Sequence, residues 1–257
     1  MRLDDFGWSE ELASHFSPWA EKRDLCPGRV TVQFNYLYRV VVELPDAGAR
    51  EIDAVLAGRL KHRVVSRSEL PAVGDWVVVR RRPGEDRGSI IAVLPRRSRF
   101  SRRAAGHATD EQVVAANVDV IFIVMALDAD YSLRRLERYL LLARESGADP
   151  VVLLTKPDLH PDPAAAAAAV RGVAGGVPVH VVNPKSGEGI DQVAVYLPPG
   201  RTGALLGSSG VGKSTIINRL AGAEIRRTRD VREADSKGRH TTTNRELVVL
   251  PGGGLII

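Results

Sequence analysis

The 257-residue sequence predicts a small all-β barrel followed by an α/β domain with a mostly parallel sheet. From Arg29 onward, apolar side chains recur at every second residue, which is the period of a half-buried strand. Residues 118–127 are almost continuously apolar, as expected of a strand covered by helices on both faces. Because further apolar runs alternate with helix-like segments after this point, the second domain is expected to be an α/β sandwich.

The barrel prediction rests on about five short strands separated by turn signals, a pattern that fits an OB-fold best. The first is one extended segment whose apolar face carries Val30, Val32, Phe34, Tyr36, Tyr38, Val40 and Val42. The others are expected at 51–56, 61–65, 76–80 and 89–94, with turns such as 71–75 between them. Residues 1–28 are interpreted as an N-terminal tail, either a short helix or loosely packed, and 29–95 as the OB-fold domain.

Residues 96–116 are interpreted as an Arg-rich linker, and 117–257 as the α/β domain. Strands are expected at 118–127, 150–154, 177–182 and 203–206. Helices are expected at 133–145, which ends at Gly147, at 164–169, which follows Pro163, and at 214–220.

Composition narrows the possible partners. The formal net charge is +5, and residues 58–103 hold 13 basic against 4 acidic side chains. Such a patch favours a nucleic-acid surface over a merely solvated basic face, which is the alternative. Cys26 is the only cysteine, so no internal disulfide and no Cys-based zinc cluster can form from these residues. No apolar stretch reaches the length of a membrane span, and residues 1–5 lack the pattern of a signal peptide, so a cytoplasmic protein without a membrane partner is expected.

A phosphate-binding loop is predicted by the pattern G-x-x-x-x-G-K-[ST], here Gly207-Ser208-Ser209-Gly210-Val211-Gly212-Lys213-Ser214-Thr215. A predicted strand leads into this loop and a predicted helix leaves it, which is the context that the motif requires. Backbone N–H groups and the helix N-terminus would face the phosphates. Lys213 is expected to reach the β- and γ-phosphates, and the Ser214 hydroxyl to ligate Mg²⁺.

A base-reading motif is predicted at Thr155-Lys156-Pro157-Asp158, where the strand 150–154 ends. This fits N-K-x-D with Thr in first place. The Asp158 carboxylate can accept two hydrogen bonds from guanine, whereas adenine offers no such pair of donors. The stem of Lys156 can lie over the base. Because this motif precedes the phosphate loop, reversing the order found in ordinary small GTPases, the sequence indicates a circular permutation.

Two further segments are weaker candidates. Asn183-Pro184-Lys185 stands where a third guanine-contacting loop is expected, but Pro184 has no N–H, so the Lys185 amide is the candidate donor and a plain loop is the alternative. The segment Lys237-Gly238-Arg239-His240-Thr241-Thr242-Thr243 offers threonine hydroxyls for Mg²⁺. There His240 is a candidate to position or activate the attacking water, and a solvated histidine is the alternative.

Taken together, the two nucleotide motifs, their reversed order, G-R-H-T-T-T and the OB-like front domain resemble the circularly permuted RsgA GTPase family, the GTPases that depend on the small ribosomal subunit. The resemblance covers the chain from Arg29 onward. It implies that 155–158 contact guanine, that 207–215 hold GTP or GDP and Mg²⁺, and that Thr241 or Thr242 is the switch threonine. It also implies that His240 replaces the usual catalytic glutamine.

The resemblance implies partners as well: the family acts late in maturation of the small ribosomal subunit, the subunit stimulates hydrolysis, and the OB domain binds ribosomal RNA. A monomer that does not bind DNA is expected. Thr155 and Pro184 depart from the family's guanine pocket. In the family, an Asp-x-Pro-Gly switch and a C-terminal zinc-binding domain follow the strand at 253–257, so any zinc ligands lie beyond Ile257, whether by truncation or in a longer natural chain.

Two RNA-binding features are proposed from the residues. Phe34, Tyr36 and Tyr38 share one strand face and could stack on bases, although such a stripe more often forms barrel core. The arginines at 80–82, 96, 97, 99, 102 and 103 are candidates for phosphate contacts.

Two alternative functions remain at this stage. One is a nucleotide-gated RNA-binding module whose hydrolysis is incidental. The other is an ATP-using P-loop kinase or ATPase in which the T-K-P-D segment is coincidental.

Overall fold

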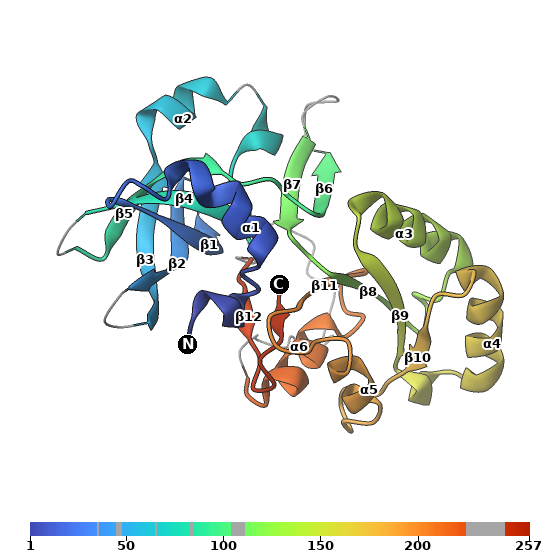
Figure 1. The fold of residues 1–257 in the computed structure, drawn as a ribbon. Coiled ribbons are helices and arrows are strands. Elements are labelled where there is room, and N and C mark those ends of the chain that lie inside the picture. The colour runs from blue at the N-terminus through green and yellow to red at the C-terminus, as the bar shows by residue number, and fades with distance from the viewer. Residues whose placement is uncertain (35, 45–47, 65, 83–84, 104–110, 225–244) are drawn as a thin grey trace, which may run out of the picture.

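The computed structural model describes all residues except 35, 45–47, 65, 83–84, 104–110 and 225–244, and only the backbone of 102, 103 and 111 (Figure 1). It contains a closed antiparallel-rich barrel, a two-stranded ribbon and a six-stranded α/β sheet. Among the described helices, none is both long and apolar enough to cross a membrane.

The barrel has the strand order β1-β2-β3-β5-β4, which confirms the predicted OB-like barrel. Its strands are β1 (Leu25–Phe34), β2 (Leu37–Leu44), β3 (Gly48–Leu56), β4 (Trp76–Arg81) and β5 (Arg87–Val93). The helical elements of this half are η1 (Leu3–Phe6), α1 (Glu10–Phe16), η2 (Ser17–Trp19), α2 (Gly58–Arg63) and η3 (Arg67–Glu69).

The single extended segment expected from Arg29 is instead an antiparallel hairpin of β1 and β2. Phe34 pairs with Leu37, so this turn alone would put even-numbered residues of β1 opposite odd-numbered residues of β2. A register shift between Val30 and Val32 reverses that effect, and Val30 therefore pairs with Val40. Because the bulge offsets the turn, Val30 of β1 shares the barrel core with Tyr38, Val40 and Val42 of β2, and all four are even-numbered, so the sequence shows no interruption.

The strand expected at 61–65 is wrong, because α2 (Gly58–Arg63) occupies most of that range. This segment lies in the connection from β3 to β4, which are not neighbours in the barrel, so it pairs with no strand there. Leu60 of α2 packs against the barrel core.

The N-terminal residues are not a loose tail. Leu3, Phe6, Leu12 and Phe16 are buried in a cluster that also contains Trp76 of the barrel. The expected short helix is present as α1, with Ser9 as its N-cap.

The ribbon consists of β6 (Arg99–Arg103) and β7 (Glu111–Ala116), two antiparallel strands within the segment interpreted as a linker. The large sheet has the order β10-β9-β8-β11-β13-β12, and only the β12–β13 pair is antiparallel. Its strands are β8 (Val120–Ala126), β9 (Asp149–Thr155), β10 (Val179–Val181), β11 (Thr202–Leu206), β12 (Val248–Val249) and β13 (Leu255–Ile256).

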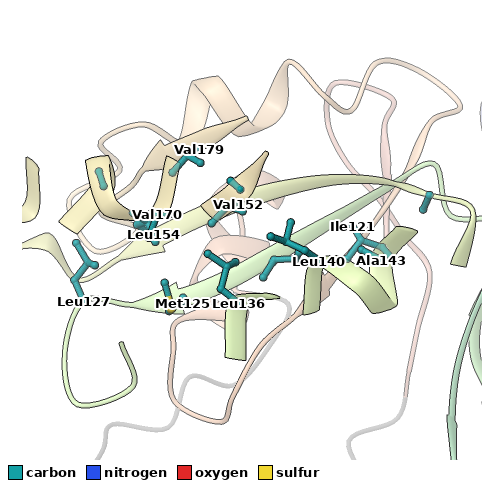
Figure 2. Close-up of a cluster of buried hydrophobic side chains, with 14 of the residues drawn as sticks. Ile121, Met125, Leu127, Leu136, Leu140, Ala143, Val152, Leu154, Val170 and Val179 are labelled. Carbon is teal, nitrogen blue, oxygen red and sulfur yellow. The ribbon is translucent and has the colours of Figure 1, made fainter. Parts of the chain in front are cut away.

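Helices cover both faces of this sheet, as the apolar runs predicted (Figure 1). They are α3 (Leu133–Ser146), η4 (Pro157–Leu159), α4 (Pro163–Ala174), α5 (Ile190–Ala194) and α6 (Lys213–Ala221). On one face, Leu136, Leu140 and Val170 from α3 and α4 pack onto side chains of β8 and β9, as Figure 2 shows. On the other face, Val193 and Ile216 from α5 and α6 form a second cluster with Phe122.

Arg29 joins the barrel to the α/β sheet. Its side chain is fully buried, at 1% exposure. The guanidinium donates to the carbonyl oxygens of Gly74 (3.2 Å), Phe6 and Asn117 (3.1 Å), and to the Thr202 hydroxyl of β11 (2.9 Å). Burial lowers the pKa of Arg29 to about 10, so the guanidinium remains charged at neutral pH. One buried cation therefore ties together the N-terminal segment, the barrel, the residue Asn117 before β8, and β11.

Replacing Arg29 with methionine is expected to destabilise the folded chain by about 3 kcal/mol or more, because several buried acceptors lose their donor at once. Urea unfolding followed by circular dichroism measures this. Arg39→Met is the matched control, since Arg39 is an exposed arginine on the same barrel. Equal midpoints for the two variants would contradict the assigned role of Arg29.

Candidate functional site

The predicted site residues converge at one edge of the large sheet. The strands β8, β9, β10 and β11 are mutually parallel, so their carboxyl ends lie together. Ligands of open α/β sheets bind outside these ends. The loops that follow these strands carry the phosphate-loop pattern, T-K-P-D and Asn183-Pro184-Lys185.

The phosphate loop connects β11 to α6 in the strand–loop–helix setting that the sequence predicted. Gly207 passes so close to β8 that an added Cβ would lie 2.3 Å from the Val124 carbonyl oxygen. Gly212 has a φ of +100°, a conformation that L side chains rarely adopt. The loop's path therefore requires glycine at both positions, and α6 begins immediately afterwards at Lys213.

Lys213 folds back over its own loop. Its ammonium donates to the carbonyl oxygens of Gly207 (2.8 Å) and Ser208. Burial lowers the pKa of Lys213, and the nearby Asp130 carboxylate opposes that shift. Ser214 and Thr215 are half-buried in the first turn of α6, beside this lysine.

Thr155 joins the T-K-P-D loop to the phosphate loop. Its side chain is fully buried, and its hydroxyl donates to the Val211 carbonyl oxygen at 2.6 Å. An added Cβ at Gly212 would lie 3.9 Å from the Thr155 methyl carbon and 3.7 Å from a ring carbon of Pro184. All three sequence motifs thus meet around Gly212.

Lys156 adopts a left-handed backbone conformation, with φ +55°, at the point where β9 turns into η4. Its ammonium contacts the Asp128 carboxylate at 2.7 Å. Burial raises the pKa of Asp128, but hydrogen bonds, above all that from Lys156, outweigh it and hold the pKa below its usual value. Pro157 lies at the start of η4, and Asp158 is exposed next to it, facing solvent at the end of β9.

The Asn183 loop is fixed by its own side chains and by α6. The Asn183 side-chain oxygen accepts a hydrogen bond from the backbone N–H of Lys185 at 3.1 Å. The Lys185 N–H, which was the candidate guanine donor, is therefore already hydrogen-bonded within its own loop. Arg219 of α6 donates to the carbonyl oxygens of Pro184 (2.9 Å) and Lys185. The loop is therefore held against the helix that leaves the phosphate loop.

Three further residues of the site lie in the loop after β8 and at the start of α3, and they were not predicted from the sequence. Asp128 and Asp130 line a cleft of about 320 Å³, and Arg135 contacts Asp130. The other residues that line the cleft are Lys156, Ser209, Gly210 and Val211. The usable signal was the pair of aspartates directly after the apolar run 118–127, at the carboxyl end of a predicted central strand.

The catalytic and switch candidates His240, Thr241 and Thr242 lie outside the described residues. Within the part of the chain that the structure describes, no group of three or more His, Cys, Asp or Glu side chains is placed to hold a metal ion.

A phosphate loop on a central strand, beside a T-K-P-D loop on a strand that comes earlier in the chain, defines a circularly permuted P-loop GTPase. Residues 93–257 match the family model described as RsgA GTPase. The chain belongs to the RsgA GTPase family, which confirms the resemblance found in the sequence.

Individual relatives agree with this assignment. The chain is 49% identical over 265 residues to the small ribosomal subunit biogenesis GTPase RsgA of Opitutus terrae, covering 100% of this chain and 71% of that relative. It is 44% identical to the protein of the same description from Methanosarcina acetivorans, covering 98% of this chain and 65% of that relative. The crystal structure of YjeQ from Thermotoga maritima superposes with a TM-score of 0.64 at 25% identity, covering 90% of this chain and 73% of that one.

Proposed function

We propose that this chain is a GTPase that binds the small ribosomal subunit and assists its late maturation, hydrolysing GTP to GDP and phosphate with stimulation by the subunit. Its membership of the RsgA family supports GTP hydrolysis and a role in ribosome biogenesis. The observation that best supports nucleotide binding is that Thr155 and Pro184 both lie next to Gly212 of the phosphate loop. The chain acts in the cytoplasm, where the proposed partner matures.

In this proposal the phosphates bind in the loop between β11 and α6. Lys213 now donates to two neutral carbonyl oxygens, and phosphate oxygens replace them on binding. That exchange is favourable because a hydrogen bond between two charged groups is stronger than one to a neutral acceptor. The backbone N–H groups at the start of α6 supply further donors without rearrangement.

The residues present fit Mg²⁺ as the accompanying ion. Mg²⁺ prefers oxygen ligands and is usually held by one or two protein groups together with substrate phosphates. The Ser214 hydroxyl, half-buried next to Lys213, is such a group. The bound ion neutralises charge on the phosphates. Thr241 or Thr242 is the proposed second protein ligand, and His240 is proposed to position the attacking water.

Guanine is selected by the 155–158 loop. The Thr155 hydroxyl is hydrogen-bonded to the Val211 carbonyl oxygen, so Thr155 holds the phosphate loop next to the 155–158 loop. Asp158 is exposed and is proposed to accept two hydrogen bonds from guanine. Lys156 lies across the cleft from the phosphate loop, where its stem is proposed to cover the base.

Ribosomal RNA is proposed to bind a barrel surface formed by Phe34, Tyr36, Leu37 and α2. Tyr36 is 62% exposed, and the Lys61 ammonium lies over its ring at 5.4 Å. Arg59 and Arg63 of α2 are exposed as well. An exposed aromatic ring with a cation over it, on a barrel face whose helix α2 carries further exposed cations, suits the stacking of a base and contact with its phosphates.

Several of the residues first proposed for RNA contact have other roles in the fold. Tyr38 is fully buried in the barrel core. Arg96 forms a buried ion pair with Asp75 at 2.7 Å and also donates to the carbonyl oxygens of Ser68 and Leu70. These contacts stabilise the barrel, and the RNA proposal therefore rests on Tyr36 and α2.

Tyr36→Ala is expected to weaken binding to purified small ribosomal subunits by about tenfold, the lower range for losing one stacked base. Lys61→Gln is expected to weaken binding and its dependence on salt, because one cation near the RNA phosphates is lost. Binding is measured by pelleting with the subunits at several salt concentrations. Arg171→Gln, an exposed charge removed from α4 on the far domain, is the control. If both barrel variants bind the subunit as tightly as the Arg171→Gln control does, the proposed RNA-binding surface is contradicted.

The central test is GTP turnover with and without purified small ribosomal subunits. The proposal expects the subunit to raise turnover strongly, and His240→Ala to lower the stimulated rate by about 100-fold because water positioning is lost. Phosphate release at saturating GTP measures both. Tight GTP binding with no stimulation by the subunit would replace the proposal with a nucleotide-gated RNA-binding module.

A further inference from the structure

The proposed nucleotide cleft contains two carboxylates, although its ligand is a polyanion. Asp128 and Asp130 both line it, beside Ser209 and Gly210 of the phosphate loop. Each has a cationic partner: Lys156 contacts Asp128, and Arg135 contacts Asp130. Unpaired, either carboxylate would repel phosphate across a short distance.

Arg135 also contacts the phosphate loop. It lies in the first turn of α3, where its backbone N–H donates to the capping hydroxyl of Ser132. The same guanidinium nitrogen, Nη1, donates to the Asp130 carboxylate and to the Ser208 hydroxyl, the latter at 2.7 Å. The side chain is 28% exposed and that of Asp130 is 18% exposed, so the pair is only partly screened by solvent.

The contacts continue to Lys213. Ser208, which Arg135 holds by its hydroxyl, also accepts a hydrogen bond from Lys213 through its carbonyl oxygen. The Asp130 carboxylate and the Lys213 ammonium are also near enough to attract each other. Two cations, Arg135 and Lys213, therefore experience the field of one carboxylate.

We propose that Arg135 is a positioning residue of the nucleotide site: it neutralises Asp130 and fixes Ser208, which leaves Lys213 available to the phosphates. The inference rests on the proposed function. Without Arg135, Asp130 takes Lys213 as its counter-ion and competes with the phosphates for the same ammonium. Arg135 therefore supports nucleotide affinity without touching the nucleotide.

Arg135 could act only by holding α3 against the phosphate loop, or it could act by neutralising Asp130. These two roles predict different effects when Asp130 is replaced as well. If Arg135 only clasps α3 to the phosphate loop, removing Asp130 as well breaks one more contact and cannot restore binding. If Arg135 compensates Asp130, then Asp130→Asn removes the competing charge and restores binding in the absence of Arg135.

The experiment measures dissociation constants of fluorescent GDP and of a fluorescent, non-hydrolysable GTP analogue for the full chain. The variants are Arg135→Gln, Arg135→Lys, and Arg135→Gln combined with Asp130→Asn. Arg134→Gln is the matched control, because it removes the same charge from the neighbouring, exposed position of α3. Thermal unfolding of each variant identifies any that fail to fold, and Arg135→Lys, which keeps the charge, is then compared in place of Arg135→Gln.

We expect Arg135→Gln to weaken nucleotide binding at least about tenfold, the lower range for one charge-assisted hydrogen bond. Adding Asp130→Asn should recover most of that loss, and Arg135→Lys should bind better than Arg135→Gln. Arg135→Gln affinities equal to those of Arg134→Gln would overturn this inference alone, as would a loss that Asp130→Asn leaves unchanged. Failure of the unmodified chain to bind guanine nucleotides would overturn the proposed function together with this inference.

Discussion

The buried Arg29 guanidinium is the interaction on which the arrangement of the two domains depends. It is fully buried yet charged, and it is stabilised only because acceptors from four separate segments surround it. One of those acceptors is Thr202, the first residue of β11. Since β11 leads directly into the phosphate loop, one buried cation links the barrel to the strand that carries the nucleotide site.

A second connection runs through the end of the described chain. The backbone N–H of Leu247 donates to the Thr31 carbonyl oxygen of β1 at 2.8 Å, and Glu246 forms a bridge with Val32. Leu247 and Leu255 are buried in the same cluster as barrel side chains. The sheet and the barrel therefore share a hydrophobic cluster in addition to the polar contacts of Arg29.

The nucleotide site was largely predictable from the sequence, because its motifs are local. A strand, a glycine-rich loop and a helix follow one another within residues 202–221, and each can be identified without knowing the rest of the fold. The apolar run of β8 likewise predicted a strand covered on both faces. What the sequence could not show was the role of Thr155, since its hydroxyl acts on the Val211 carbonyl oxygen, 56 residues away.

The errors came from features that only tertiary contacts determine. The turn between β1 and β2 was hidden because a bulge restored the alternation that the turn had shifted. Helix α2 lies in the connection from β3 to β4, and which strands become neighbours in the barrel is not encoded by local propensity. Arg96 was predicted to contact RNA phosphates, whereas it forms an ion pair with the buried Asp75.

The most direct test of guanine recognition by the 155–158 loop is competition between GDP, XDP and ADP for the unmodified chain and for Asp158→Asn. The unmodified chain should prefer GDP by about 10³-fold or more, because the other bases would cover the Asp158 carboxylate without supplying it with a pair of donors. Asp158→Asn should reverse the preference toward XDP, since the amide can donate to the xanthine carbonyl. Equal binding of ADP and GDP, or an Asp158→Asn variant that still prefers GDP, would contradict the account.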